Sequence, residues 1–389
     1  MAIKKMQELD LQGKTVVIRE DLNLHMIEGR ITYDKRARAA LPTIKIALEK
    51  GAGVVLISHL GRPTEGQFEE QFSLKPVAKH LAELLGKPVT LAKTMADAKA
   101  MPGTVTLLEN VRFLKGEKKN NPELAAQLAA LGDVYVMDAF GAAHRAHSST
   151  EGAVRVAKTA CAGPLLQAEL EAFGKVLDNP ARPLAAIIGG SKVSTKLALL
   201  ENLLQKVDTL IVGGGIANTF LAATGHNVGK SLYEEELIPD AKRILELAAK
   251  LGKKMPLPTD VVVASELASG QAVSVCGVDA VPSDKMILDI GPDTLAQYKT
   301  LLDEAATVVW NGPVGAFETE PFGKGTLELA QYLAKGKAFV VVGGGDSVAA
   351  VEKYGLADKM GYISTGGGAS LELLEGKVLP SVAALEARG

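Results

Sequence analysis

The chain has 389 residues, more than one hydrophobic core usually serves, so two domains are expected. A hydrophobic content of 47% supports full cores, and a formal net charge of −2 gives no general attraction to nucleic acids or membranes. Cys161 and Cys276 form no CxxC pair, which argues against a disulfide framework or a cysteine zinc site. The sequence has neither a signal-peptide core nor an apolar run near the ~18 residues of a membrane span, so a cytoplasmic protein is expected.

In the first half, short apolar runs alternate with helical stretches and stop at cationic or polar residues. The runs KTVVIREDLN, GVVLISHLGR, TVTLLENVRF and DVYVMDAFGAAHR stop at Arg19, Asp21, Asn23, His59, Arg62, Arg112, His144 and Arg145. Between the first two runs, Asp34 to Lys50 has helical spacing, and Gly51 ends the helix. Such runs predict buried parallel strands, whose carboxyl ends form ligand sites. An arginine-rich edge suits a small polyanion.

A helix beginning near Pro164 and ending at Asn179-Pro180 is predicted to connect the two domains. Strands resume at Leu184 and alternate with helices to about Leu374. In this half the runs stop mostly at glycines, in LAAIIGGSK, DTLIVGGGIAN (which contains Gly213), TVVWNGPVGAFE and FVVVGGGDS. A glycine-rich edge suits the phosphates of a nucleotide. The tail EGKVLPSVAALEARG contains no strand, and its apolar residues predict packing on the first domain.

Three glycine-rich segments suit anion binding. Gly189 to Lys196 is predicted to open a helix with Lys192 and Lys196 on one face; the alternative is a glycine turn followed by solvated lysines. In Gly343 to Ser347, Asp346 is placed to bind Mg²⁺ beside a nucleotide, or to cap its helix, or both. Thr365 to Ser370 adds a third predicted helix N-terminus.

Other patterns in the chain fit known motifs only in part. Gly225 to Ser231 has three residues between its glycines where a P-loop needs four, and it follows a predicted helix rather than a strand. No glycine cluster completes GxGxxG. His144 and His147 lack a third ligand with matching spacing, so contacts to a substrate are favoured over metal binding. No arrangement typical of a covalent nucleophile is present.

Several of these segments together resemble phosphoglycerate kinases of the bacterial type. They are REDLN (19–23), SHLGRP (58–63), LENVRF (108–113), DAFG (138–141), Gly189 to Lys196, WNGP (310–313), Gly343 to Ser347 and Ser364 to Lys377. The resemblance implies an α/β fold with two Rossmann-like domains that contain parallel sheets and are joined by a helix and hinge. It also implies reversible phosphoryl transfer from 1,3-bisphosphoglycerate to Mg-ADP, giving 3-phosphoglycerate and Mg-ATP, by a monomer.

The resemblance also implies a role for individual residues. The glycerate substrate would be held by Asp21, Asn23, Arg36, His59, Leu60, Gly61, Arg62, Arg112 and Arg145. The nucleotide would be held by Lys196, Gly213, Asn311, Pro313, Glu318, Gly344, Gly345, Asp346 and Ser347, with Asp346 also binding Mg²⁺. Arg36, Lys192 and the helix start at Gly367 and Gly368 would act on the transferred phosphoryl group. The implied division is a substrate domain 1–163, a connecting helix 164–179, a nucleotide domain 180–374 and a returning tail 375–389.

The chain departs from the family pattern at three positions: Glu20 replaces an apolar residue, His25 a proline and Ala142 a threonine. None of these removes a charged group with an assigned role. Because the acceptor oxygen is already deprotonated, the reaction needs positioning and charge neutralisation rather than a general base. Arg36 and Lys192, from opposite domains, would act together when the protein closes on its substrates. The alternative is a catalytically silent two-domain protein that binds nucleotides or anions.

Overall fold

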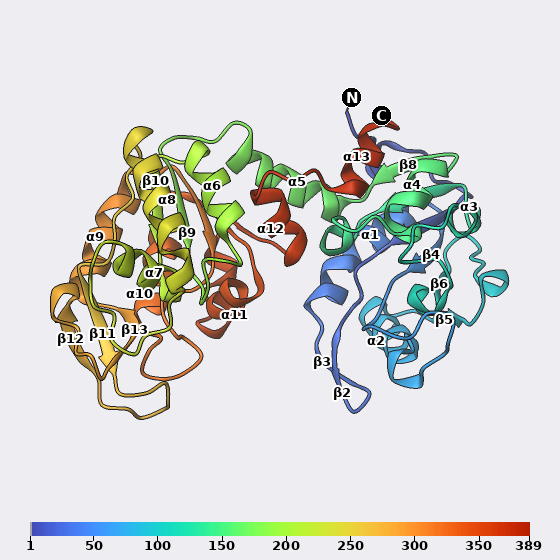
Figure 1. Cartoon of the computed structure of the whole chain (residues 1–389). Helices are drawn as coiled ribbons and strands as arrows, with labels where there is room; N and C mark the ends of the chain where they lie inside the picture. Colours follow the sequence, from blue (N-terminus) through green and yellow to red (C-terminus); the bar gives the residue numbers. More distant parts are fainter. Residues whose placement is uncertain (1) are drawn as a thin grey trace. The chain divides into compact units, whose positions relative to one another are not determined.

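The computed structural model describes residues 2–389, which form two compact units (Figure 1). Unit 1 consists of two segments, one from the start of the described chain to Glu171 and the other Val378–Gly389. Unit 2 is the continuous segment Ala172–Lys377. Unit 2 is therefore inserted into the sequence of unit 1.

Unit 1 is built on a six-stranded sheet in the order β5-β6-β4-β1-β7-β8, in which every neighbouring pair is parallel. A two-stranded hairpin, β2–β3, precedes the first long helix. The strands are β1 (Thr15–Arg19), β2 (His25–Ile27), β3 (Arg30–Tyr33), β4 (Gly53–Ile57), β5 (Val89–Ala92), β6 (Val105–Leu108), β7 (Val134–Met137) and β8 (Ala160–Ala162). The helices are α1 (Lys35–Glu49), α2 (Lys75–Leu85), α3 (Pro122–Ala129), α4 (Ala153–Val156) and α13 (Pro380–Glu386).

Both faces of the six-stranded sheet are covered. On one face, Ile18 of β1 and Leu56 of β4 pack in one cluster with Ile44 of α1. Val17 and Val55 alternate with them along the strands and point to the other face, yet they are equally buried. A strand buried on both faces needs a continuous apolar run rather than an alternating one, which is why the sequence predicted these strands correctly.

Unit 2 contains a five-stranded sheet in the order β10-β9-β14-β15-β16, again parallel throughout. Its strands are β9 (Leu184–Ile188), β10 (Thr209–Val212), β14 (Thr307–Asn311), β15 (Phe339–Val342) and β16 (Tyr362–Ile363). Its helices are α6 (Leu197–Lys206), α7 (Gly214–Ala223), α8 (Ile238–Lys250), α9 (Pro292–Asp303), α10 (Lys324–Lys335), α11 (Gly345–Lys353) and α12 (Gly368–Leu374). The expected α/β architecture, with a parallel sheet in each half, is confirmed.

Unit 2 also contains a three-stranded antiparallel sheet that the sequence patterns did not reveal. Its strands are β11 (Asp260–Ala264), β12 (Ser274–Gly277) and β13 (Met286–Ile290), in the order β12-β11-β13. It packs against α7, α9 and α10. This small sheet supplies one wall of the cavity described below.

Helix α5 (Pro164–Leu177) leads out of unit 1, and its first turn is capped by a buried carboxylate. Asp138, just after β7, accepts hydrogen bonds from the backbone N–H groups of Leu165 (2.9 Å) and Leu166 (3.1 Å), and its other oxygen accepts one from the Thr43 hydroxyl (2.5 Å). Glu20 is fully buried beside it and hydrogen-bonds to the same carboxylate. Burial, followed by the charge of Asp138, raises the pKa of Glu20 well above its usual value, so Glu20 is the protonated partner and donates to Asp138.

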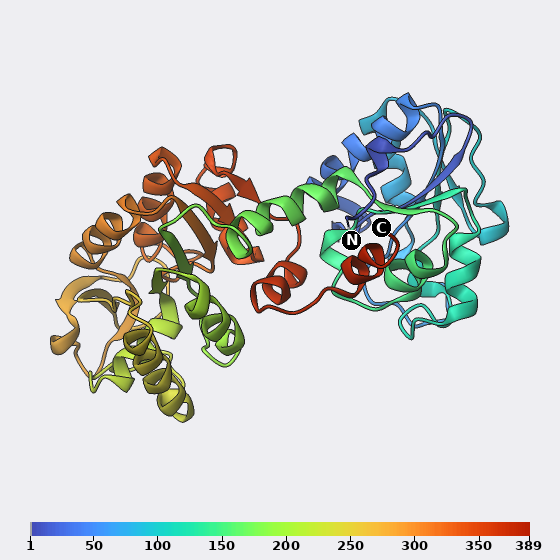
Figure 2. The same ribbon diagram turned by 90° about the horizontal axis from the view of Figure 1, so that it is seen from above.

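The C-terminal segment returns to unit 1, and Figures 1 and 2 agree in placing α13 beside the start of the described chain. The Lys4 ammonium donates to the carbonyl oxygen of Arg388 (2.9 Å), and Ser381 donates its backbone N–H to Ala143 (3.2 Å). The two ends of unit 1 are thus held together directly.

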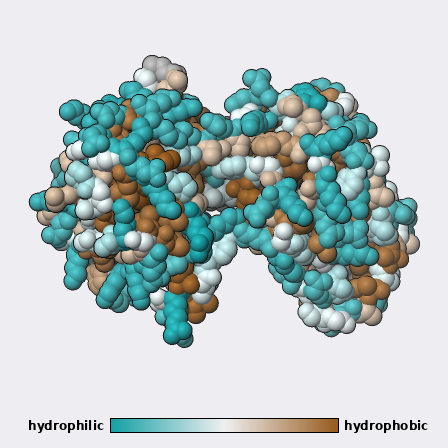
Figure 3. Space-filling model, turned by 180° about the vertical axis from the view of Figure 1, so that it is seen from behind, coloured by the Kyte–Doolittle hydropathy of each residue, from teal (hydrophilic) through white to brown (hydrophobic). Residues whose placement is uncertain are grey.

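Hydrophilic and hydrophobic residues are interspersed on the face shown in Figure 3. Within residues 2–389, no helix combines the length and the apolar character needed to cross a membrane.

The Glu20–Asp138 pair predicts a dependence of stability on pH. Since the pKa of Glu20 is raised in the folded protein, its contribution to stability is present at low pH and is lost as pH rises through that pKa. Glu20→Gln keeps a donor for Asp138 but cannot ionise. Compared between pH 6 and 10 by thermal and urea unfolding, the variant should become more stable relative to wild type as pH rises toward the folded pKa of Glu20, by up to about 1.4 kcal/mol per pH unit, and the difference should level off above that pKa. A constant difference across that range would show that Glu20 is not the titrating member.

Candidate functional site

In unit 1, the parallel register brings the carboxyl ends of the central strands to the same edge. Arg19, the last residue of β1, lies opposite Ile57 of β4 on one side and Met137 of β7 on the other. The segments after β1, β4, β6 and β7, which carry most of the predicted substrate residues, therefore leave the sheet together.

Arg36, in the first turn of α1, is held beside Asp21 and Asn23. Its guanidinium donates to the carbonyl oxygen of Asn23 (2.9 Å) and lies 3.4 Å from an oxygen of Asp21. The side-chain oxygen of Asn23 accepts from the backbone N–H of Gly61 (2.9 Å), and Asp21 accepts from that of Asn23 (3.1 Å). These contacts link the loop after β1 to the loop after β4, and they leave about a third of the Arg36 side chain exposed.

His59 is buried among arginines. Burial, and then the charges of Arg19, Arg112, Arg145 and Arg36, hold the pKa of His59 well below its usual value, so the ring is neutral. Arg19 lies 3.2 Å from its Nδ1, and since an arginine can only donate, the ring proton is on Nε2. His59 therefore offers one N–H donor. The same physical cause, burial followed by nearby arginines, lowers the pKa of His147 to about 4.

Arg112 follows β6 and is only 5% exposed. It donates to the carbonyl oxygen of Gly61 (2.5 Å), while its Nε, also buried, has no hydrogen-bond partner. Burial, followed by repulsion from Arg145 and Arg19, lowers the pKa of Arg112 to about 10. A buried guanidinium with an unused donor among other cations is the arrangement expected where an anionic ligand completes the charge balance.

The remaining predicted residues of unit 1 lie on the same loops. Leu60 is buried. Its backbone N–H donates to the side-chain oxygen of Asn110 (3.2 Å), and its carbonyl oxygen accepts from the side-chain amide nitrogen of the same residue (2.8 Å). Arg62, after β4, is exposed, and Arg145, after β7, is half-buried. Sequence reasoning gave no role to Arg19 or Asn110, which support His59 and the loop after β4 respectively.

In unit 2, glycines bring the strand ends into close backbone contact. A Cβ at Gly189 would lie 1.8 Å from the Pro313 carbonyl oxygen, and one at Gly213 would lie 2.7 Å from Val314. Gly344 has a φ of +89°, and a Cβ there would also crowd Asn311. At Gly189 and Gly213 a larger residue would displace the neighbouring backbone, and at Gly344 the positive φ and the Asn311 side chain disfavour one.

The prediction that Lys192 and Lys196 share a helical face is wrong, because α6 begins only at Leu197. Glu234, from a distant segment, accepts hydrogen bonds from both the backbone N–H (2.9 Å) and the hydroxyl of Ser194, and residues 194–196 form a turn instead. Lys196 folds back and donates to the carbonyl oxygens of Gly189 (2.6 Å) and Asn311 (3.2 Å). Burial lowers its pKa to about 8, although the nearby Asp346 acts in the opposite direction.

Asp346 is the second residue of α11 and is exposed. The cap position belongs to Gly344, and no side chain caps this helix, so the carboxylate of Asp346 is not used as a cap. Ser347 is buried, and its hydroxyl accepts from the backbone N–H of Gly312 (2.5 Å). Gly367 has a φ of +49° and precedes α12, which starts at Gly368.

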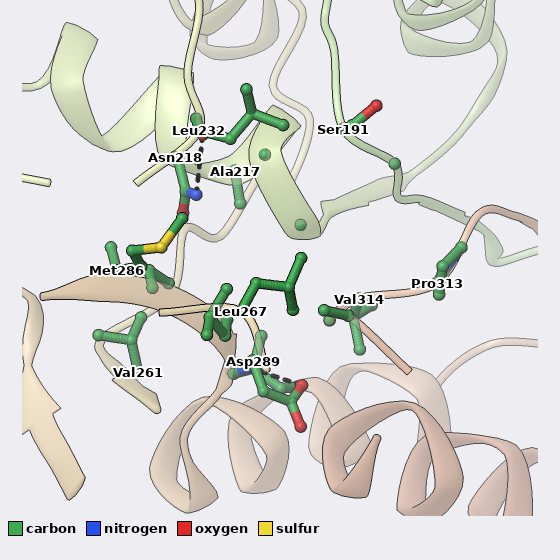
Figure 4. A pocket seen from close by; sticks show the side chains of 18 of the residues that line it. Ser191, Ala217, Asn218, Leu232, Val261, Leu267, Met286, Asp289, Pro313 and Val314 are labelled. Carbon is green, nitrogen blue, oxygen red and sulfur yellow. Dashed lines mark hydrogen bonds between the residues drawn. The ribbon is translucent and has the colours of Figure 1, made fainter. Parts of the chain in front are cut away.

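A cavity of about 280 Å³ opens beside this edge. Its polar side includes Ser191, Glu318 and Asp346. The other side is apolar, and Figure 4 shows Leu267 pointing into the space between Met286 and Val314. A cavity with one apolar and one polar, glycine-lined side suits a nucleoside with its phosphates.

The apolar wall was missed at the level of sequence because much of it comes from β11, β13 and the loop that contains Leu267. The signal in the sequence was the apolar run MILDI, which a single carboxylate, Asp289, interrupts. By contrast, the rejected segment Gly225 to Ser231 does follow a helix, α7, as expected.

A polyanion-binding edge on one α/β unit and a nucleotide-type cavity on another define a class, the small-molecule phosphotransferases. Over residues 6–377, the chain matches the family model described as phosphoglycerate kinase. It is 74% identical over 388 residues to a phosphoglycerate kinase of Desulfovibrio desulfuricans, with 100% of both chains covered. It is 58% identical to one of Nitratidesulfovibrio vulgaris, covering 100% of this chain and 99% of the relative.

Solved structures agree. The phosphoglycerate kinase of Coxiella burnetii superimposes with a TM-score of 0.96 at 53% identity, with 100% of both chains covered. That of Pyrococcus horikoshii gives 0.84 at 32% identity, with 99% and 98% covered. The chain belongs to the phosphoglycerate kinase family. It is a phosphotransferase with a carboxyl group as acceptor, which moves a phosphoryl group reversibly between 1,3-bisphosphoglycerate and ADP in glycolysis.

Proposed function

We propose that the two strand-end edges divide the work of this reaction, the first binding the glycerate substrate and the second the nucleotide. The implied domains are 1–163 for the substrate and 180–374 for the nucleotide, with 164–179 between them and 375–389 returning to the first. The observation that carries the proposal is the contrast in charge and shape. Arg36, Arg112 and Arg145 surround a neutral His59, whereas the edge of unit 2 is glycine-lined beside an apolar cavity.

In the substrate site, the residues have complementary tasks. Arg112 and Arg145, with Arg62, would bind the phosphate of the glycerate, because guanidinium groups pair with phosphate oxygens in a planar, bidentate manner. His59, with its proton on Nε2, would donate to a ligand oxygen without adding charge. Asp21 and Asn23 would accept from the hydroxyl of the substrate. Gly61 and Leu60 would contribute by placing the loop.

At the transferred phosphoryl group, we propose that Arg36 acts from the substrate side and Lys192 from the nucleotide side. In-line transfer spreads negative charge over the equatorial oxygens, and fixed cations lower the barrier by stabilising that charge. Backbone N–H groups at the start of α12, near Gly367 and Gly368, would add their dipoles. Since transfer requires the two substrates to meet, hinge closure is part of the proposal.

In the nucleotide site, Lys196 would bind phosphate oxygens, and Glu318 would accept from the ribose. The close-packed backbone of Gly213, Asn311 and Pro313 would line the site, while Gly344, Gly345 and Ser347 would hold the phosphates at the start of α11. The chain fits Mg²⁺ as well: Asp346 is an exposed carboxylate at this edge that caps nothing. No group of three or more carboxylate, imidazole and thiol ligands is found among residues 2–389, and a single carboxylate beside the phosphates is how Mg²⁺ is commonly held with nucleotides. When bound, the ion would neutralise phosphate charge.

We further propose that the protein works as a monomer in the cytoplasm, where glycolysis runs. A catalytically silent binding protein is the alternative, and the presence of Arg36, Lys192 and Asp346 argues against it.

The first test supplies 3-phosphoglycerate and Mg-ATP and follows 1,3-bisphosphoglycerate through its downstream reduction. We expect turnover of many per second, abolished by EDTA and restored by excess Mg²⁺. Binding of both ligands without turnover would support the silent alternative, and turnover unaffected by EDTA would contradict the role of the metal.

Arg36→Ala tests the substrate side of the transfer. Loss of a charge-assisted contact of about 1.5–3 kcal/mol lowers the rate about ten- to a hundredfold, and a transition-state role adds to this. The matched control is Arg38→Ala, on the same helix, whose 62% exposed side chain pairs with Asp34. Steady-state kcat should fall by orders of magnitude in the first variant and stay within about twofold in the second. Activity of Arg36→Ala above a tenth of wild type would rule out the assigned role.

The lowered pKa of Lys196 predicts that nucleotide affinity falls at alkaline pH. Its pKa of about 8 means that the ammonium loses its charge above that pH, whereas the nucleotide phosphates stay ionised. In wild type, kcat/KM for the nucleotide should decrease above pH 8. Lys196→Arg stays charged, so its profile should be flat in that range. The same alkaline decrease in both proteins would assign it to another group.

A further inference from the structure

Asp289 is the one carboxylate of the apolar wall of the cavity. It lies in β13, is 3% exposed, and is the lowest of the labelled side chains in Figure 4. Burial, and then the charges of Glu328 and Glu320, raise its pKa to about 7, against two backbone N–H groups that act to lower it. A buried carboxylate in a wall of otherwise apolar side chains is costly and needs a reason.

The hydrogen bonds of Asp289 connect the wall to α10. One carboxylate oxygen accepts from the backbone N–H of Gly325 (2.7 Å), in the first turn of α10, and the other from that of Ile290 (2.9 Å). Gly325 packs directly on the carboxylate, since a Cβ there would lie 2.4 Å from Oδ1. Asp289 thus caps α10 from a neighbouring strand.

The same carboxylate supports the loop Pro313–Glu318. Gly315 packs on it so closely that a Cβ would lie 2.3 Å from Oδ1, and Ala316 donates its backbone N–H to Leu288 (2.9 Å). From the other side, the Lys353 ammonium of α11 donates to the carbonyl oxygen of Phe317 (2.7 Å). Glu318 follows directly and lines the cavity. Its position depends on how this loop is fixed.

Asp260 is a comparable helix-capping carboxylate that has no contact with Gly315 of the Pro313–Glu318 loop. It lies on β11 of the same small sheet, is 6% exposed, and accepts from the backbone N–H groups of Thr294 (2.7 Å) and Asp293 (3.1 Å) at the start of α9. A Cβ at Gly291 would lie 2.2 Å from its carboxyl carbon. Asp260 itself is not among the described residues that line the cavity, although Pro258 and Val261 on either side of it are. The two residues therefore share the structural role, and only Asp289 has the additional contact with Gly315.

We propose that Asp289 is a positioning residue for the nucleotide, which holds the Pro313–Glu318 loop so that the carboxylate of Glu318 meets the ribose hydroxyls. The inference rests on the proposed ribose contact of Glu318. It predicts that Asp289 governs the preference for a nucleotide with ribose hydroxyls, although Asp289 itself need not touch them.

The test compares Asp289→Asn, Asp260→Asn and Glu318→Ala. Asn offers one acceptor where the carboxylate offers two, so both Asn variants lose part of a helix cap and should lose similar stability. Only Asp289→Asn should raise KM for Mg-ATP, about tenfold, with KM for 3-phosphoglycerate within about twofold. It should also lose the preference for ATP over 2′,3′-dideoxy-ATP, as Glu318→Ala does, and the double variant should be no worse than Glu318→Ala alone.

Gly315→Ala is the second variant, for the case in which Asp289→Asn does not fold. It leaves the carboxylate and the α10 cap in place but pushes the loop away from them, and it should reproduce the KM increase and the loss of preference. If Glu318→Ala loses the preference while the folded Asp289 and Gly315 variants keep it, the positioning role is overturned. An equal KM increase in Asp260→Asn would also overturn it. If Glu318→Ala itself keeps the preference, the ribose assignment fails first and takes this inference with it.

Discussion

The parallel pairing of strands is the constraint on which the rest of the molecule depends. In each large sheet, every strand runs in the same direction, so all carboxyl ends arrive at one edge and all connecting helices start there. The residue that follows each strand then decides the chemistry of that edge. After β1, β4 and β6 these are Glu20, Ser58 and Glu109, each leading into a polar loop; after β9, β10 and β15 they are glycines. One architecture therefore carries two sites of opposite character.

The arginine-rich edge is a cluster of like charges held together by neutral and acidic groups. Arg19 donates to a Ser149 hydroxyl (2.9 Å), and that serine in turn binds the buried Glu117. Neutral His59 separates the guanidinium groups without adding to their repulsion. Such a cluster favours binding of an anion, because the ligand supplies negative charge that balances the guanidinium groups. Ligand binding and the folding stability of unit 1 are consequently coupled.

The sequence predicted an element correctly wherever the residues of that segment alone determine its structure. Continuous apolar runs such as TVVIR predicted the buried parallel strands, and the predicted helix from Asp34 to Lys50 matches the bounds of α1 within one residue at each end. It failed where a distant residue decides. The turn at Ser194 depends on Glu234, the cap of α5 on Asp138, and the apolar wall on β11, β13 and the loop that contains Leu267. The family resemblance supplied candidate residues but not the contacts that hold them, so the supporting roles of Arg19, Asn110 and Asp289 emerged only from the structure.

The insertion of unit 2 into unit 1 has a consequence for the order of folding. Unit 2 is continuous, so it can fold from contacts within Ala172–Lys377. Unit 1 is complete only when Val378–Gly389 packs against its first segment. The contact between Lys4 and Arg388 closes a loop that spans nearly the whole chain. The entropy of closing a loop grows only logarithmically with its length, and a folded unit 2 shortens the effective loop further. We therefore expect α13 to dock late, after the segment between the two parts of unit 1 has folded.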